Sequence, residues 1–243
     1  MEILFSSNSG MSRERLISYL RNLRDADQRL TVVDLGGAGA PWTAEVADAF
    51  VDINSSTERP TITGDLHSPE LWDEIRRRNF RFCICSHTLE DLRDPLFVLR
   101  QIRQTFNHGY IAVPNKHVEF SHIESQSYVG YGHHRWVFTL TPSALRVIAK
   151  WPFASYFSPR RRAINSLKAS AIASAYRRLR GREPGLSSLG PLPWWRHDLA
   201  GPNNELAFAW RGSIDFDSIN ADYAGESVYT LARIYRDELA TGL

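Results

Sequence analysis

The 243-residue chain contains the stretch Val32-Val33-Asp34-Leu35-Gly36-Gly37-Ala38-Gly39, in which a short apolar run ends in an acidic residue and a cluster of glycines. Glycines directly after a parallel strand let the chain turn tightly and let a ligand approach backbone N–H groups. The stretch therefore predicts a strand followed by a ligand-binding turn.

Short apolar runs and helical patterns alternate around this stretch. The apolar runs cover residues 30–35, 49–53, 61–64, 80–86 and 110–113. Helical patterns cover residues 11–25, 68–77 and 94–106, and the last two begin with a capping residue followed by proline, which is a helix-start signal. Near-continuous hydrophobic strands that alternate with helices predict a doubly wound α/β fold with a mostly parallel sheet.

Beyond residue 115 the pattern is less regular. We expect a strand at 135–140, a helix from Thr141 to about Trp151, a basic helix-prone segment at 160–182, an ordered loop at 183–198, two strand pieces in 205–216 and a terminal helix at 228–239. The organisation predicted is a single domain, 1–243, in three parts. These are an N-terminal helical segment (1–29), a ligand-binding core (30–157) and an irregular C-terminal extension with sheet-edge strands (158–243).

The composition limits the classes of partner that we expect for this chain. A formal net charge of +2 argues against nucleic acid as an obligatory partner, because phosphate binding favours a markedly basic surface. No apolar run is long enough to span a membrane and the N-terminus lacks the pattern of a signal peptide, so we expect a cytoplasmic protein without a membrane partner. Cys83 and Cys85 are expected to be buried thiols. A homodimer is left open.

Acidic residues follow three successive strands of the predicted sheet. Asp34 lies in the glycine turn and suits a ligand with an amino group. Asp52 can accept hydrogen bonds from both hydroxyls of a ribose, and Asp65 can face an adenine amine. A dinucleotide fingerprint would need a third glycine where this chain has Trp42, preceded by Pro41, so NAD or FAD binding is disfavoured.

These features in series resemble class I S-adenosylmethionine (SAM)-dependent methyltransferases. The family's first turn reads roughly D-x-G-x-G-x-G, where this chain has Asp34-Leu35-Gly36-Gly37-Ala38-Gly39-Ala40. Ser86-His87-Thr88-Leu89-Glu90-Asp91-Leu92-Arg93-Asp94-Pro95 is similar to the family's S-x-x-L-E-H-x-x-D-P, and Gly109-Tyr110-Ile111-Ala112-Val113-Pro114-Asn115 is similar to its G-G-x-x-x-x-x-P-N. The resemblance covers roughly residues 30–150.

The resemblance implies a Rossmann-like fold and SAM as the methyl donor, with S-adenosylhomocysteine (SAH) as its product. It implies that the glycine turn holds the methionine part, Asp52 the ribose and Asp65 the adenine. The cofactor-binding residues expected are Asp34, Gly36, Gly37, Gly39, Asp52, Ile53, Asp65, Leu66, Ser86 and His87. The acceptor expected is a small molecule such as a sugar or secondary metabolite, methylated on oxygen or nitrogen.

A bacterial subgroup of methyltransferase-like proteins shares three further features with this chain: a shortened first helix, G-Y-I-x-x-P and then H-H-R-W. The chain departs from the wider family in the spacing of its glycines, in Pro41-Trp42 after the turn, and in Arg81, where the family often has Asp. These departures leave open a non-catalytic relative that binds a ligand or partner. Another nucleotide-dependent enzyme, such as a dehydrogenase, is the second alternative.

The segment 115–135 is rich in histidine and overhangs the predicted pocket. One interpretation is that His133 and His134 order a loop by bonding to carboxylates. A second is a general base near the transferred methyl group, with His87, His134 and His133 as candidates, because neutral imidazole titrates near working pH. A third is a metal site built from His117, His122, Glu124 or His133, but no helical HxxxH spacing supports it, and a site without metal is expected.

Overall fold

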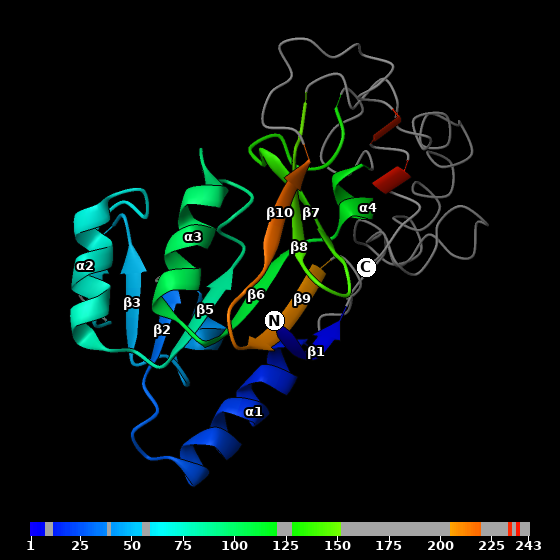
Figure 1. The fold of residues 1–243 in the computed structure, drawn as a ribbon. Helices are drawn as coiled ribbons and strands as arrows, with labels where there is room; N and C mark the ends of the chain where they lie inside the picture. Colours follow the sequence, from blue (N-terminus) through cyan, green and yellow to red (C-terminus); the bar gives the residue numbers. More distant parts are fainter. Residues whose placement is uncertain are drawn as a thin grey trace, which may run out of the picture.

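The computed structural model of this chain describes residues 1–7, 12–37, 40–54, 59–120, 128–151 and 205–219, with 233–234 and 237–238. Its centre is a seven-stranded sheet with the strand order β1-β9-β6-β5-β2-β3-β4 (Figure 1). The strands are β1 (Glu2–Ser7), β2 (Val32–Leu35), β3 (Ala49–Asp52), β4 (Thr61–Thr63), β5 (Phe82–Ser86), β6 (His108–Pro114) and β9 (Glu205–Arg211).

Neighbouring strands from β4 to β6 all pair in parallel, whereas β9 pairs antiparallel with both β6 and β1. The helices that connect them are α1 (Ser12–Ala26), α2 (Pro69–Arg78) and α3 (Pro95–Thr105), with a short α4 (Lys116–Glu119) after β6. A doubly wound, mostly parallel α/β sheet is therefore confirmed.

Two of the predicted helix starts have the expected caps. The side chain of Ser68 accepts a hydrogen bond from the backbone N–H of Leu71 at the start of α2, and Asp94 caps α3 through the N–H of Phe97. In both helices proline follows the cap, where its missing N–H costs nothing. Local sequence signals alone fix these two helices.

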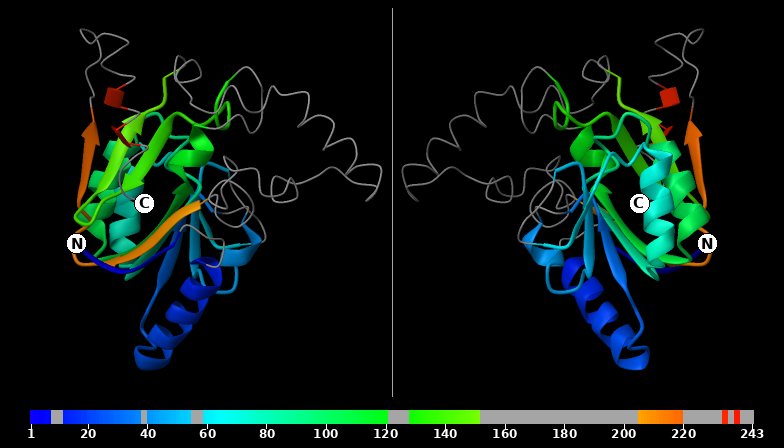
Figure 2. Two further views of the ribbon diagram at one scale, coloured as in Figure 1. Left: turned by 90° about the vertical axis from the view of Figure 1, so that its right-hand side faces the viewer. Right: turned by 90° about the vertical axis from the view of Figure 1, so that its left-hand side faces the viewer.

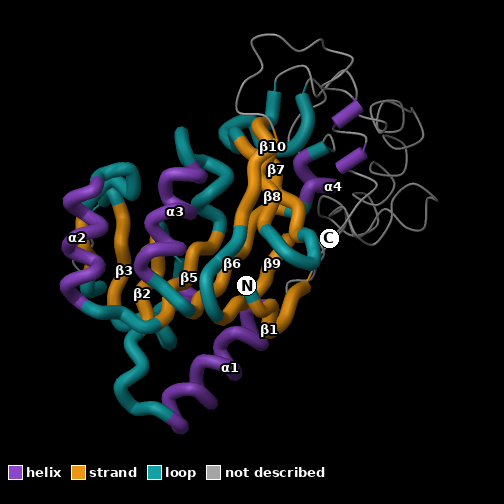
Figure 3. Tube along the Cα trace, in the orientation of Figure 1, coloured by secondary structure: helices purple, strands orange, loops and turns teal. Residues whose placement is uncertain are grey.

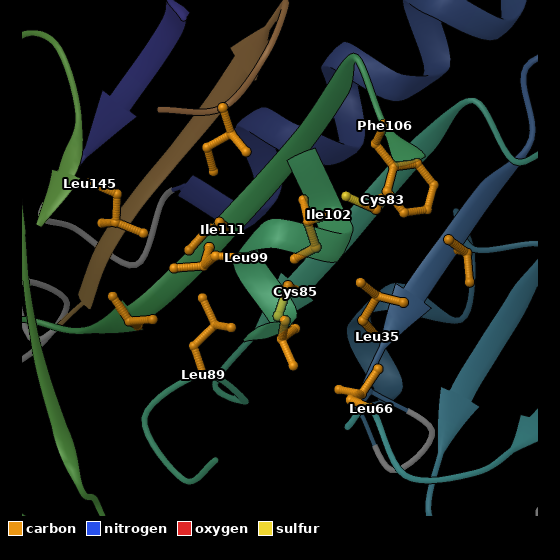
Figure 4. Close-up of a cluster of buried hydrophobic side chains, with 14 of the residues drawn as sticks. Leu35, Leu66, Cys83, Cys85, Leu89, Leu99, Ile102, Phe106, Ile111 and Leu145 are labelled. Carbon is orange, nitrogen blue, oxygen red and sulfur yellow. The ribbon is translucent and has the colours of Figure 1, made fainter. Parts of the chain in front are cut away.

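Alternate side chains of the strands pack into two different clusters, one with α2 and α3 and one with α1. Figure 2 shows the ribbon from two opposite directions. Val33, Cys83 and Cys85 face α2 and α3, whereas Val32 and Ile84 face α1. Figure 4 shows both cysteines within the first of these clusters, next to Leu99 and Ile102 of α3. Both are buried free thiols, as predicted, and burial raises the pKa of each well above its usual value.

A second sheet, with the order β10-β8-β7, lies beside β6 and β9 (Figure 3). It contains β7 (Trp136–Leu140), β8 (Leu145–Ala149) and β10 (Phe216–Ile219). The helix expected from Thr141 to Trp151 is therefore wrong. Thr141 instead closes a hairpin: its N–H and its hydroxyl both donate to the carbonyl of Ala144, and its hydroxyl accepts from the N–H of Ala144. Strand β8 then pairs antiparallel with β7. A start signal for a helix and a tight turn use the same residue types.

The N-terminal segment holds α1 as expected, but also the unexpected edge strand β1. Of the two strand pieces expected within 205–216, the first is present as β9. The next strand, β10, begins only at Phe216, at the end of that range, and belongs to the other sheet. Helical structure occurs at 233–234 and 237–238 within the expected terminal helix. The expectations for 160–182 and 183–198 lie outside the described residues. Among the residues described, every helix is too short or too polar to cross a bilayer.

The strand order places one reversal in the sheet. From β2 the chain moves outward to β3 and β4, then returns to β5 on the other side of β2 and continues to β6. In open α/β sheets, ligands bind at the carboxyl ends of the strands where the order reverses. We therefore expect a ligand site at the carboxyl ends of β2 and β5.

Candidate functional site

A cavity of about 250 Å³ opens at this reversal. It is lined from the ends of β2, β3 and β4 on one side and from the loop after β5 on the other. Its lining residues are Gly36, Val51, Asp52, Ile53, Gly64, Asp65, Leu66, His87, Thr88, Asp91 and Leu92. The volume is slightly below the range of about 300–1,000 Å³ that is usual for small-molecule sites, so the cavity suits a nucleoside-sized group.

The glycine turn is held tightly across the reversal. Gly36 has a φ of 86°, a conformation that favours glycine, and its N–H donates to the carbonyl of Val51 at 2.7 Å. A side chain at Gly36 would collide with Thr88, whose hydroxyl donates to the carbonyl of Leu35 at 3.0 Å. The loop after β5 thus clamps the end of β2, which leaves backbone exposed to the cavity.

The link from the turn to β3 is short. Among the described residues of this link, the only helical piece is the 3₁₀ turn η1 (Pro41–Thr43). A dinucleotide site places its pyrophosphate at the N-terminus of a helix that follows the glycines directly. In the described part of this link, the 3₁₀ turn stands where such a site would need that helix.

Asp52 ends β3 with one carboxylate oxygen uncommitted. Its Oδ1 accepts a hydrogen bond from the backbone N–H of Asn54 at 3.0 Å, and no described residue bonds to its Oδ2. The next side chain, Ile53, is 74% exposed and lines the same cavity. The end of β3 therefore offers a hydrogen-bond acceptor beside an apolar surface.

Asp65 is already engaged by its neighbours. Its Oδ1 accepts from the backbone N–H and the Nδ1 of His67, both at 2.8 Å, and these bonds lower the pKa of Asp65. The Nε2 of His67 accepts from the backbone N–H of Asp94, which joins the end of β4 to the start of α3. Asp65 lines the cavity, and through His67 it also holds the end of β4 to the start of α3.

Asp34 lies beneath the turn and does not line the cavity. Its carboxylate is fully buried in the space that a side chain at Gly37 would occupy. Neither of its oxygens is hydrogen-bonded by a described residue, and the nearby Thr43 hydroxyl donates to the Ala40 carbonyl instead. Burial raises the pKa of Asp34 to about 6, against smaller lowering effects of Thr43 and Arg59.

His87 sits between two buried carboxylates. Its Nδ1 is 3.2 Å from Glu90 Oε1, and its Nε2 is 3.8 Å from Glu205 Oε2 on β9. Burial alone would lower the pKa of His87, but the two carboxylates outweigh it and raise that pKa to about 9. A pKa of about 9 favours the imidazolium form of His87 at neutral pH, which is a proton donor, whereas the role of general base expected from the sequence needs the neutral form.

Glu205 gathers several groups from elements that are distant in the sequence. It accepts hydrogen bonds from Ser12 at the start of α1 and from the hydroxyl of Tyr110 on β6, and it pairs with Arg13 at 3.5 Å. Although burial acts to raise it, the pKa of Glu205 is lowered by His87 and Arg13. Sequence reasoning missed this residue, because only the antiparallel pairing of β9 with β6 brings it to the site.

His133 and His134 come close to the cavity through Asp91. The Nε2 atoms of the two histidines lie 4.0 and 3.9 Å from Asp91 Oδ1, and Asp91 lines the cavity. His134 also bonds through Nδ1 to the buried Glu119 at 2.7 Å. Of the metal-ligand set considered from the sequence, His122 and Glu124 lie outside the described residues.

Six of the predicted cofactor residues line the one cavity: Gly36, Asp52, Ile53, Asp65, Leu66 and His87. Asp34, Gly37 and Ser86 do not line it, and Gly39 lies outside the described residues. Thr88 and Asp91 were missed as lining residues. They lie within the motif after β5 that was quoted for the family resemblance, so position within that motif was the available signal.

A larger cavity, of about 410 Å³, lies at the opposite, amino-terminal end of the strands. It is lined by residues between the helices and the strand starts, among them Leu23, Asp27, Arg81 and His108, and Arg81 pairs there with Asp27. Ligands of open α/β sheets bind at the carboxyl ends, so size alone does not make this cavity the functional site.

Comparisons with known proteins give distant likenesses only. No family model matches the chain, and no curated protein is similar to it. Among solved structures, WbdD is 14% identical over 44% of this chain and 29% of its own, with a TM-score of 0.36. A SAM-dependent methyltransferase from Anabaena variabilis ATCC 29413 is 10% identical over 46% of this chain and 56% of its own, with a TM-score of 0.35.

The methyltransferase domain of bacterial CtHen1 aligns over 82% of this chain and 99% of its own, at 10% identity and a TM-score of 0.37. For WbdD and the Anabaena protein, the chain spans less than two-thirds of the length of each. With TM-scores this low, the likenesses carry no argument about function, and the function has to be argued from the residues of this chain.

Proposed function

We propose that this chain binds SAM in the cavity at the strand reversal and transfers its methyl group to a small-molecule acceptor. The observation that carries the proposal is the convergence of six residues, predicted as cofactor ligands from separate strand ends, on one cavity. Parallel strands bring their ends to one edge of the sheet, and here the residues at the ends of β2, β3, β4 and β5 line a single cavity at that edge.

The end of β3 fits the nucleoside half of SAM. The free Oδ2 of Asp52 can accept hydrogen bonds from ribose hydroxyls while Oδ1 stays bound to Asn54. Ile53 places an exposed apolar side chain beside it, on which a flat base would pack. Both residues line the cavity, and among the described residues none bonds to the Oδ2 of Asp52, so the fit needs no rearrangement of the fold.

The glycine turn suits the methionine half. Gly36 presents backbone in place of a side chain, and the carboxylate of Asp34 beneath the turn has no cationic partner within hydrogen-bond distance among the described residues. SAM carries an ammonium and a sulfonium, and its sulfonium supplies an already activated methyl group. Positioning of the acceptor can then contribute much of the acceleration.

The acceptor would enter from the side of His87. The His87 imidazolium, held by Glu90 and Glu205, can donate a hydrogen bond to an oxygen of the acceptor or cofactor. A proton acceptor is required only if the methylated atom is a hydroxyl oxygen. His87 cannot fill that role at neutral pH.

Calorimetric titration of the full chain with SAM and SAH tests the binding step. We expect micromolar-range binding of both. Asp52→Ala should weaken it at least tenfold, because a hydrogen bond to a charged group contributes about 1.5–3 kcal/mol. Ile53→Ser should weaken it by about fivefold through lost apolar burial, and its exposure means that folding should be unaffected.

Asp73→Ala is the matched control, since Asp73 is an exposed carboxylate on α2 that pairs with Arg76. Absence of binding by both ligands, or equal affinities for Asp52→Ala and the control, would reject the proposal. Methyl transfer from labelled SAM into a pool of small molecules, against a pool of proteins, tests the acceptor class.

A further inference from the structure

Three potential metal ligands converge beside the cavity. One ring nitrogen of His133, one of His134 and a carboxylate oxygen of Asp91 all lie within 4.8 Å of one another. The separations of 4.0 and 3.9 Å from Asp91 Oδ1 exceed a hydrogen bond, so neither histidine is bonded to this oxygen. Ligand atoms about 2.0–2.2 Å from a tetrahedral metal ion lie about 3.3–3.6 Å apart, so a side-chain shift of about half an ångström would bring these atoms to ligand distance.

His134 is held as metal-binding histidines are. Its Nδ1 donates to Glu119 Oε1 at 2.7 Å, which places the ring proton on Nδ1 and leaves the lone pair on Nε2, toward Asp91. Glu119 is buried, and its second oxygen accepts from Lys150 Nζ at 2.6 Å. Lys150 thus neutralises the Glu119 carboxylate and fixes its position. An ion pair on the protein surface would not need a buried carboxylate and a lysine to orient its histidine.

The backbone around the three groups is also fixed. The N–H of Arg135 donates to the carbonyl of Glu90 at 2.7 Å, which ties the start of β7 to the residue before Asp91. Gly130 has a φ of 62° and packs against Glu119, where a side chain would not fit. Residues from the loop after β5 and from the segment before β7 are therefore held at a set separation.

We propose that Asp91, His133 and His134 bind a divalent transition-metal ion of the Zn²⁺ type. Two imidazoles and one carboxylate suit such an ion better than Mg²⁺ or Ca²⁺, which prefer oxygen ligands. Asp91 and His133 are 47% and 62% exposed, which leaves coordination positions open to solvent and to the cavity that Asp91 lines. The proposal does not rest on methyl transfer.

This assignment changes two expectations from the sequence. It replaces the expected metal-free site and the ligand set that included His122 and Glu124. It also removes His133 and His134 as general bases, because a nitrogen whose lone pair binds a metal cannot accept a proton.

The test is titration of the chelator-treated full chain with Zn²⁺, followed by calorimetry, and with Co²⁺, followed by visible absorption. We expect one equivalent of Zn²⁺ to bind in the micromolar range or tighter, and Co²⁺ to give the absorption bands of nitrogen ligation. His133→Ala and Asp91→Asn should each weaken binding at least tenfold. Glu119→Gln, which changes the hydrogen bond that orients His134, should weaken it by about 10–100-fold.

His108→Ala is the control, since His108 is a histidine at the start of β6, bonded to Arg211 at 3.0 Å and away from the site. Because His133 is exposed, its variant should keep the wild-type circular dichroism spectrum, so its result does not depend on how Glu119→Gln folds. Failure of stoichiometric Zn²⁺ binding, or wild-type affinity in both His133→Ala and Asp91→Asn, would overturn the proposal. SAH titration of the metal-free chain tests the proposed function separately.

Discussion

The buried carboxylate of Asp34 should make the stability of this protein fall as the pH rises. Its pKa of about 6 lies about two units above the ordinary 3.8. At about 1.4 kcal/mol per unit, ionised Asp34 destabilises the folded state by about 3 kcal/mol. Because the folded pKa is the higher one, the folded state binds the proton more tightly. The contribution of Asp34 to stability is therefore most favourable below about pH 4 and falls between about pH 4 and 6.

Asp34→Asn keeps the shape of the side chain and removes its charge at every pH. We expect the variant to gain on the wild type by about 1.5 kcal/mol between pH 5 and pH 8, since part of the full effect is already present at pH 5. Urea unfolding followed by tryptophan fluorescence at the two pH values measures the two differences in unfolding free energy. The comparison within each pH cancels the effect of every other titrating group.

Asp65→Asn is the control that should show equal stability differences at pH 5 and pH 8. Hydrogen bonds from His67 lower the pKa of Asp65 below the ordinary 3.8, so its contribution is fully present at both pH values and is lost only as the pH falls further through the folded pKa. Equal stability differences between Asp34→Asn and the wild type at pH 5 and pH 8 would refute the argument, because an unburied or paired Asp34 would give that result.

Two further predictions concern the turn and the loop that clamps it. Gly36→Ala should destabilise the fold by at least about 2 kcal/mol in urea unfolding, since it combines a positive φ with a collision against Thr88. The double variant with Thr88→Ala should lose less than the sum of the two single losses, and strict additivity would contradict the contact. For His87, the folded pKa of about 9 exceeds the usual 6.5, so its stabilisation by Glu90 and Glu205 is complete below pH 6.5 and is lost as the pH rises through about 9. The stability difference between wild type and His87→Gln should therefore shrink from about pH 6 to about pH 10, and a constant difference would count against the two carboxylate contacts.

Local sequence signals were sufficient to predict an element wherever the residues that favour it lie within the element itself or directly beside it. The caps Ser68 and Asp94 with their prolines located α2 and α3, and the apolar runs located the five parallel strands. Where one pattern serves two structures, prediction failed. Thr141-Pro142-Ser143-Ala144 can begin a helix or close a hairpin, and the pairing of β8 with β7 and β10 decides between them.

Some residues of the candidate site could likewise be chosen from the sequence, and the position of another could not. Asp52, Ile53 and Asp65 could be chosen from the sequence because each follows a strand, and parallel strands bring their ends to one edge. Asp34 fits the same rule but is buried beneath Gly37, since its side chain turns toward the sheet instead of the cavity. Position after a strand predicts proximity to a site and does not predict the direction of the side chain.

The sequence by itself determined the doubly wound sheet and the edge at which the cavity lies, because strand and helix periodicity and the turn glycines are local properties. Only the tertiary structure decided the electrostatics of the site. Glu205 reaches His87 through the antiparallel pairing of β9, and Asp91 faces His133 and His134 through the tie between β7 and the loop after β5. The charge of an imidazole and its suitability as a metal ligand depend on groups that are distant in the chain, so no local pattern can specify them.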